Sequence, residues 1–161
     1  MSPLQLVESV VSEPELLAVR SDLLGDLEVR ASDVFSFPRG VLGFPECRRF
    51  ALLRGARDGL YWLQSLDYSA LAFLLVDPFT VMSNYAVDVE PWQVAEIGSA
   101  DPSDLGLLAI VTLPSQRGEL ATVNLQGPLA FNFRTRRAKQ IICAEDTHGV
   151  RCPVDLQRFV A

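Results

Sequence analysis

Histidine and lysine are almost missing from this chain of 161 residues, which contains one of each, His148 and Lys139. A Ser-His-Asp or Cys-His catalytic arrangement would have to use that single histidine. The sequence also lacks a G-x-S-x-G nucleophile motif and the glycine-rich loops that bind phosphates in nucleotide-dependent enzymes. These absences argue against the common hydrolase and nucleotide-binding classes, and we expect a protein that is not an enzyme.

Metal-binding and acid–base candidates are few. Cys143, His148 and Cys152 form a C-x4-H-x3-C spacing, but a zinc site needs a fourth ligand, and none is evident. Three aspartates stand where expected strands end, beside turn residues, and such aspartates commonly cap or turn the backbone. They are Asp67, Asp77 and Asp88. We therefore expect no metal, no cofactor and no catalytic carboxylate pair.

The three cysteines form no C-x-x-C pair. No apolar run reaches the roughly eighteen residues that a membrane-spanning helix needs. Residues 1–12 lack the basic start and continuous apolar stretch of a secretory signal. These features predict a cytoplasmic protein with free thiols and no membrane contact.

Charge is distributed unevenly along the chain. The net charge is -6, but residues 129–161 carry six basic and three acidic residues, a net +3, which leaves -9 for residues 1–128. Four of the cations crowd around one expected turn, which we call the basic turn: Arg134, Arg136, Arg137 and Lys139. One interpretation is a charged hairpin tip that keeps a strand end soluble. The other is a contact with an acidic partner or with nucleic acid, although the acidic average disfavours a nucleic-acid binder.

Short apolar stretches separated by turn residues predict a mostly β fold. We expect residues 1–14 to be a flexible extension and residues 15–161 to form one small domain, a β-barrel or β-sandwich with one or two short helices. The expected strands include LLAVR, LEVR, DVFSFP, RFALL, LYWLQSL, ALAFLLV and GLLAIVTLP. Downstream we expect two further strands, LATVNL and PLAFNF, then AKQIICA, with RTRR as the turn of a hairpin. Residues 91–98 and 101–104 are expected to be helical, with Pro91 near the start of the first segment and Gly98 at its end.

Seven segments in order carry a family resemblance: FPRGVLGF, YWLQSLD, LAFLLVDPF, SNYAVDV, LLAIVTLP, ATVNLQGPLAFNFRTRRAKQII and VRCPV. Together they resemble the bacterial flagellar assembly factor FliW family from about Glu15 to Val154. The resemblance implies a small barrel-like β fold without catalysis, metal or cofactor. It also implies two protein partners, flagellin and the RNA-binding translational regulator CsrA. Bound to CsrA, such a protein prevents repression of flagellin translation, and accumulating flagellin displaces CsrA.

Two positions depart from the family pattern. Leu42 stands where the first loop usually has a second proline, and Cys152 stands where an Arg-His-Pro sequence usually has histidine. The first change loosens the loop slightly through the entropy of the unfolded chain. The second removes a histidine and with it any role of that side chain.

Partner-binding candidates follow from position in the chain. Four aromatic or proline residues flank turns and are expected to be the least committed to strand cores: Phe44, Pro45, Phe79 and Tyr85. Such residues can form an apolar groove that receives an amphipathic flagellin helix. The basic turn is a further candidate, which we expect to contact acidic residues of flagellin or CsrA. Direct RNA binding is not expected, because Phe131 and Phe133, the neighbouring aromatics, are expected to face the core.

A β-barrel that holds a small apolar ligand is the alternative. Such a barrel should contain a continuous apolar cavity, whereas a protein-binding regulator should have a filled core. The abundance of Leu, Val and Phe in the expected strands favours a filled core.

Overall fold

The computed structural model describes residues 15–99, 101–143 and 149–159. The expected extension, residues 1–14, and His148 lie outside the described residues. Within them, no helix has the length and apolar composition needed to cross a membrane.

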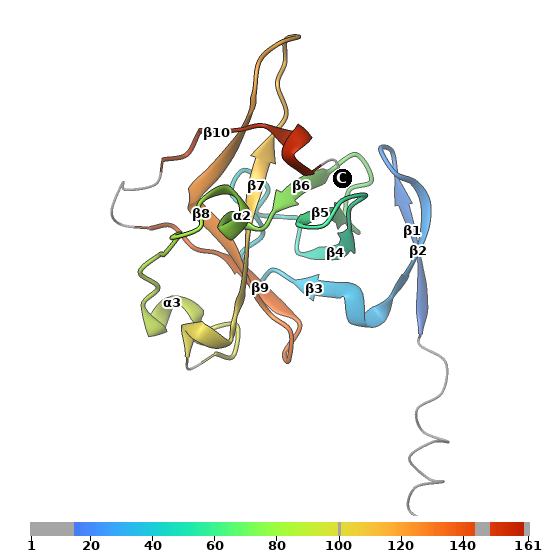
Figure 1. Cartoon of the computed structure of the whole chain (residues 1–161). Helices are drawn as coiled ribbons and strands as arrows, with labels where there is room; N and C mark the ends of the chain where they lie inside the picture. Colours follow the sequence, from blue (N-terminus) through green and yellow to red (C-terminus); the bar gives the residue numbers. More distant parts are fainter. Residues whose placement is uncertain (1–14, 100, 144–148, 160–161) are drawn as a thin grey trace, which may run out of the picture.

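An antiparallel hairpin opens the described chain. Strands β1 (Leu16–Ser21) and β2 (Gly25–Arg30) pair along their whole length and form a separate two-stranded sheet. One face packs on the rest of the molecule through a small apolar cluster that includes Val19, Val29 and Ala51. The hairpin predicted from LLAVR and LEVR is therefore confirmed, and it lies beside the main body (Figure 1).

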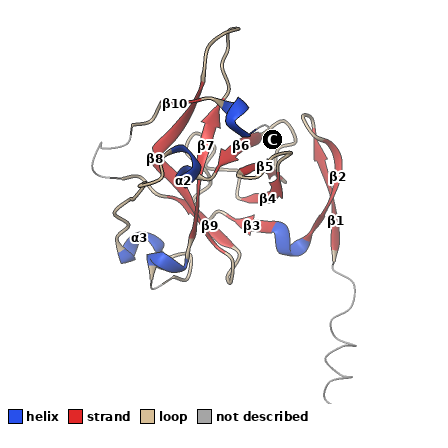
Figure 2. Ribbon diagram, viewed as in Figure 1, coloured by secondary structure: helices blue, strands red, loops and turns tan. Residues whose placement is uncertain are grey.

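Seven strands of the described chain close into a barrel (Figure 2). They are β3 (Val34–Ser36), β4 (Arg49–Arg54), β5 (Leu60–Ser65), β6 (Ala72–Val76), β7 (Gly106–Thr112), β8 (Ala121–Asn132) and β9 (Arg137–Gln140). Neighbours from β3 to β9 pair antiparallel, and a parallel bridge between Ser36 and Arg137 closes the ring from β3 to β9. Strand β10 (Cys152–Val154) adds to one end of β8. The fold is mostly β, as predicted, although β10 was not predicted.

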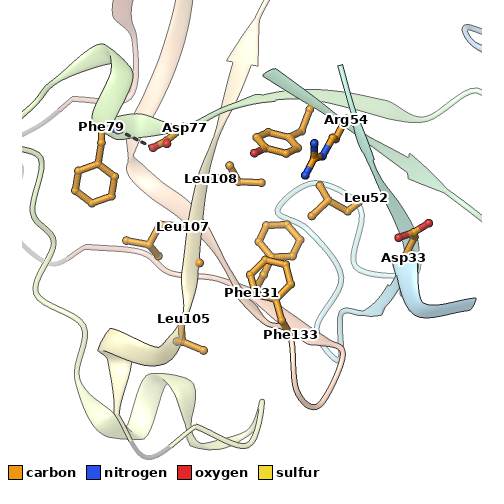
Figure 3. Close-up of a pocket in the computed structure, with 12 residues that line it drawn as sticks. Asp33, Leu52, Arg54, Asp77, Phe79, Leu105, Leu107, Leu108, Phe131 and Phe133 are labelled. Atoms are coloured by element: carbon orange, nitrogen blue, oxygen red, sulfur yellow. Dashed lines mark hydrogen bonds between the residues drawn. The ribbon is translucent and has the colours of Figure 1, made fainter. Parts of the chain in front are cut away.

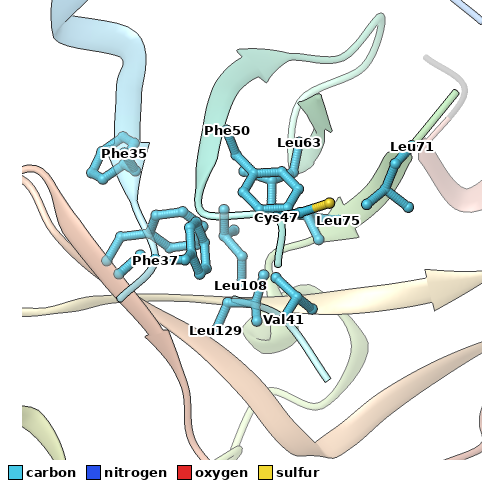
Figure 4. Close-up of a cluster of buried hydrophobic side chains, with 12 residues drawn as sticks. Phe35, Phe37, Val41, Cys47, Phe50, Leu63, Leu71, Leu75, Leu108 and Leu129 are labelled. Carbon is cyan, nitrogen blue, oxygen red and sulfur yellow. The ribbon is translucent and has the colours of Figure 1, made fainter. Parts of the chain in front are cut away.

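Aromatic side chains fill the inside of the barrel (Figure 4). The rings of Phe35 and Phe131 meet edge to face with centroids 5.1 Å apart, and so do those of Phe37 and Phe50, also at 5.1 Å. Edge-to-face contacts of this kind add stability beyond the burial of apolar area. The core is therefore filled, which is the feature expected of a protein-binding regulator.

Strand β8 is continuous, whereas the sequence predicts two strands on either side of a Gly-Pro break. The start of β8 pairs with β10 and its end pairs with β9, and β7 runs along the other edge. Leu108 and Ile110 of β7 pair with Leu129 and Asn124, so β8 carries extra residues between these two pairs. Pro128 lies in this bulge, where its missing N–H removes no ladder hydrogen bond. The prediction of two strands is wrong because the break is a corner within one strand.

The described chain also contains two short α-helices and three 3-10 helices, of which the last, η3, follows the final strand. The helices are α2 (Pro78–Val81), α3 (Pro91–Ala95), η1 (Ala31–Asp33), η2 (Pro102–Asp104) and η3 (Leu156–Phe159). Asp77 caps α2, since its Oδ1 accepts a hydrogen bond of 3.0 Å from the Phe79 amide. Helix α3 begins at Pro91 as predicted but ends at Ala95, before Gly98.

The hairpin turn between β8 and β9 follows the prediction. Asn132 Oδ1 accepts hydrogen bonds from the amides of Arg134 and Thr135, at 3.0 and 3.2 Å. The Arg136 amide donates to the Asn132 carbonyl at 2.9 Å, and Arg136 has a φ of 58°, a left-handed conformation that closes the turn.

Candidate functional site

A groove runs along the first residues of β7, where strand β6 has already ended. Val76, the last residue of β6, pairs with Ala109, so in the described chain Gly106–Leu108 pair with β8 alone. The cavity beside them has a volume of about 550 Å³. Figure 3 shows side chains of α2, β4, β5, β7 and β8 around it. We call this cavity the β7 groove.

Apolar side chains dominate the β7 groove. Leu52, Leu108 and Phe131 belong to the barrel core or pack against it, and they line the groove on the inner side of β7 (Figure 3). Phe79 and Phe133 are half exposed, at 49% and 50%, and line it as well. Half-exposed aromatic rings around an apolar depression are typical of a surface that binds another protein.

Gly106 allows Phe133 to lie across the start of β7. A Cβ at this glycine would stand 2.7 Å from Cε2 of the Phe133 ring, closer than real contacts permit. The ring also meets Phe35 edge to face, with centroids 5.6 Å apart. Phe133 is thus held in position although half of it faces solvent, so the expectation that it faces the core is only partly correct.

Four polar side chains line the β7 groove: Asp33, Arg54, Tyr61 and Asp77. The two aspartates are committed to the fold. Asp77 caps α2, and Asp33 Oδ2 accepts a hydrogen bond of 3.3 Å from the Arg30 amide. Asp67, elsewhere in the fold, accepts from the amides of Arg48 and Arg49 at 2.9 and 3.0 Å. Asp67 and Asp77 therefore fix a turn and a helix end, as the sequence predicts, and Asp33 adds a contact that was not predicted.

The sequence-predicted apolar candidates do not form one site. Phe79 lines the β7 groove, whereas the ring of Phe44 is half-buried and meets Phe73 edge to face at 5.8 Å. Pro45 is exposed in the same loop as Phe44.

The expectation for Tyr85 is wrong, because this residue belongs to the core. It is buried, and its hydroxyl donates a hydrogen bond of 2.7 Å to the Leu125 carbonyl. Burial raises the pKa of Tyr85, which is consistent with a hydroxyl kept neutral inside the protein.

A second groove lies near the Phe44 loop, with a volume of about 490 Å³. Its lining includes Phe73 and four exposed aliphatic residues: Leu42, Leu113, Leu120 and Val150. Leu42, the position where the family pattern usually has proline, is 75% exposed here. The loop that contains Leu42 and Phe44 and the turn that contains Phe79 therefore contribute to two different surface grooves.

The basic turn is not a free solvated tip. Arg134 Nη2 donates to the Gly98 carbonyl at 3.0 Å, and Arg137 Nη1 donates to the Glu96 carbonyl at 3.4 Å. Lys139 Nζ lies 2.8 Å from Glu96 Oε1. Arg134 and Arg137 thus meet backbone carbonyls just beyond the C-terminal end of α3, where positive charge is favourable, and Lys139 meets the Glu96 carboxylate.

Two neutral side chains of the same turn reinforce this connection. Asn132 Nδ2 and Thr135 Oγ1 both donate to the Ile97 carbonyl, at 2.9 and 2.8 Å. Arg136 instead lies over the Phe35 ring, 5.5 Å from its centre. The basic turn therefore holds residues 96–98 against the barrel.

Sequence reasoning did not identify Trp92, which is the most exposed aromatic side chain of the described residues at 71%. Lys139 Nζ lies 6.0 Å from the centre of its ring. A signal was present in the sequence, since Val94 and Ile97 were expected to share the buried face of this segment. Helical spacing turns Trp92 away from both of them.

The cysteine–histidine spacing cannot be placed as a metal site. Cys143 and Cys152 are free and half-buried, and burial raises the pKa of the Cys143 thiol. The described residues contain no group of three His, Cys, Asp or Glu side chains arranged to hold a metal ion.

Comparison with known proteins identifies what the chain is similar to. A family model described as FliW protein matches residues 18–154. A flagellar assembly factor FliW from Pseudothermotoga lettingae is 32% identical over 128 residues, covering 80% of this chain and 82% of that protein. The FliW of Treponema pallidum is 33% identical over 130 residues, covering 81% and 86% of the two chains.

A solved structure agrees with the sequence comparisons. A crystal structure of the flagellar assembly factor FliW superimposes with a TM-score of 0.76 at 27% sequence identity. The match covers 85% of this chain and 96% of the solved one.

Proposed function

Because the chain belongs to the FliW family of flagellar assembly factors, we propose that it acts in the cytoplasm as a non-catalytic regulator that binds flagellin and CsrA. In this role it keeps CsrA from repressing flagellin translation. Flagellin that has not been exported binds the protein and displaces CsrA. The released CsrA then represses flagellin translation, so flagellin synthesis falls when export is slow. The observation that carries the proposal is the family match over residues 18–154.

The β7 groove is our proposed site for flagellin. Flagellin has terminal segments that form amphipathic helices, which need cover before export. An amphipathic helix inserts its apolar side chains into a hydrophobic groove. The β7 groove supports this role through its volume of about 550 Å³ and its two half-exposed rings, Phe79 and Phe133.

CsrA requires a different kind of surface. It binds RNA through a basic surface, and an acidic protein approaches such a surface favourably. Residues 1–128, with a net charge of -9, supply that field.

The first experiment is recovery of the tagged protein from its own motile cells, with the bound proteins identified by mass spectrometry. We expect flagellin and CsrA. Recovery of neither partner, from a chain that runs as a monomer, would contradict the proposal.

The second experiment replaces both groove aromatics with alanine. Phe79→Ala with Phe133→Ala should weaken binding of purified flagellin at least tenfold, or about 1.4 kcal/mol, because buried aromatic anchors dominate helix–groove interfaces. Titration calorimetry measures the affinity, and Tyr68→Ala serves as a control that removes an exposed aromatic side chain away from the groove. Unchanged flagellin affinity in the double variant would exclude the β7 groove as the site.

A small apolar ligand is the second candidate occupant of the β7 groove. Its volume lies within the range of small-molecule sites, roughly 300–1,000 Å³. Mass spectrometry of molecules extracted from the purified protein tests this, and a stoichiometric metabolite or lipid would favour the ligand-binding function.

A further inference from the structure

A second surface, centred on α3, has the composition of a protein-binding site. Trp92 projects from α3 and is 71% exposed. The side chain of Gln93 donates a hydrogen bond of 3.5 Å to the carbonyl of Ile142, an exposed residue that follows β9. Trp92 and Ile142 are therefore two exposed apolar residues adjacent to Gln93, one by sequence and one through this hydrogen bond. Exposed tryptophan is uncommon on protein surfaces without a partner, and it is enriched where partners bind most tightly.

Basic residues surround this apolar centre. Arg39, Arg134, Arg136, Arg137 and Lys139 contact residues 96–98 or belong to the turn that does. The one carboxylate in this network is Glu96, which accepts Arg39 at 3.0 Å and Lys139 at 2.8 Å. Arg39 and Lys139 thus meet this carboxylate, whereas the other three cations contact backbone carbonyls or the Phe35 ring. The set contains five cations and one carboxylate on a protein whose net charge is -6. We call this set, with Trp92 and Ile142, the α3 surface.

The α3 surface is held in one arrangement before any partner arrives. Six side chains reach the three residues after α3, five from the β8–β9 hairpin and one from Arg39. A surface that is already ordered loses little conformational entropy on binding, which favours affinity. Arg39, Arg134 and Arg137 remain exposed, so their charges face solvent despite the contacts they make.

We propose that the α3 surface binds an acidic segment of flagellin, with an apolar side chain of that segment packed on Trp92. The proposal rests on the proposed function for the identity of the partner. Between the two partners, charge selects flagellin, because the basic RNA-binding surface of CsrA would be repelled by the cations of the α3 surface. The two surfaces are also continuous, since Phe133 of the β7 groove directly precedes Arg134. One flagellin molecule can therefore contact both.

The test compares Trp92→Ala and Arg137→Ala with the unmodified protein. Each should weaken the binding of purified flagellin about tenfold and leave the affinity for purified CsrA unchanged. Tyr68→Ala and Arg117→Ala are matched controls, because both remove exposed side chains outside the α3 surface. Since Trp92 is exposed, its replacement should keep the fold, and the urea unfolding midpoint verifies this for each variant.

The outcomes separate this inference from the proposed function. If the unmodified protein binds flagellin and both variants bind it equally well, the α3 surface is not a flagellin site and the proposed function stands. If the variants lose affinity for CsrA instead, the assignment of the partner is wrong. If the unmodified protein binds neither flagellin nor CsrA, the proposed function fails together with the inference.

Discussion

Glu96 is the residue through which charge stabilises the α3 region. Its carboxylate accepts Lys139 and Arg39, and its carbonyl accepts Arg137. The hydrogen bond from Lys139, helped by that from Arg39, lowers the pKa of Glu96. A carboxyl with a lowered pKa in the folded state stabilises the fold above its usual pKa of about 4.5, and this contribution disappears as the pH falls below that value.

The substitution Glu96→Gln therefore has a pH-dependent cost. At pH 7 we expect a loss of about 1 kcal/mol in the free energy of unfolding, because a partly buried ion-pair network is removed. At pH 3.5 the unmodified protein has itself lost part of this interaction, so the difference between the two proteins should shrink. Urea unfolding at both pH values measures it. Glu119→Gln, an exposed control, should cost little at either pH, and a Glu96→Gln cost that does not depend on pH would contradict the assignment.

Single residues also mark the limit of what the sequence could predict. Phe79 and Tyr85 both stand close to turns, and both are aromatic, so the sequence treats them alike. In the structure their rings meet edge to face at 5.7 Å, but only Tyr85 is buried, and the Leu125 carbonyl of β8, distant in the sequence, accepts its hydroxyl. Phenylalanine has no such group. The alternation pattern could not reveal this, since the contact depends on how the strands assemble.

At the scale of elements, the loop between β3 and β4 shows how local chemistry determines shape. Two tight turns follow each other, with the Gly40 amide bonded to the Phe37 carbonyl at 2.9 Å and the Phe44 amide to the Val41 carbonyl at 2.7 Å. Gly40 and Gly43 both have positive φ values, 65° and 91°. Their surroundings differ, because a Cβ at Gly40 would overlap the Phe44 carbonyl and lie 2.7 Å from Pro45 Cα, whereas a Cβ at Gly43 meets nothing within 4 Å.

This difference predicts unequal costs for two chemically identical changes. Gly43→Ala should destabilise the protein by about 1 kcal/mol, which is the cost of a left-handed alanine. Gly40→Ala should cost more than about 3 kcal/mol, because backbone must also move. Urea unfolding of both variants measures the comparison. Equal costs would mean that the loop rearranges freely around Gly40.

The elements themselves were largely predictable. Short apolar stretches between turn residues located nearly every strand of the barrel, because these strands pack on a common core. The continuity of β8 was not predictable, since a Gly-Pro pair inside a strand is indistinguishable from a loop until the bulge opposite β7 is seen. Strand β10 was missed because its three residues are too few to show alternation.

At the scale of the whole molecule, charge separates the surface into unlike regions. The chain is acidic overall, yet three cations of the basic turn, Arg134, Arg137 and Lys139, gather beside α3. The proposed binding of CsrA through the acidic region should therefore depend on ionic strength. We expect the association rate to fall about tenfold between 50 and 500 mM NaCl, while the dissociation rate changes less. Stopped-flow fluorescence measures the association and dissociation rates. An association rate that does not depend on the salt concentration would contradict electrostatic attraction.

The candidate binding surfaces were predictable only in part. The sequence identified Phe79 and the basic turn as candidates. The structure places Phe79 in the lining of the β7 groove and joins the basic turn to residues 96–98. The sequence did not show that the basic turn is tied to α3, because that contact joins segments about forty residues apart. Trp92 was not identified, although helical spacing turns it away from Val94 and Ile97, which are buried.

The position of Lys139 has a practical consequence for chemical labelling. It is the only lysine of the chain, and its side chain is 16% exposed with its ammonium held by Glu96. Amine-directed acylating reagents therefore have one internal target besides the α-amino group, and that target is shielded while α3 stays in place. The acylation rate of Lys139, followed by intact-mass spectrometry, therefore reports how often the α3 segment detaches from the barrel.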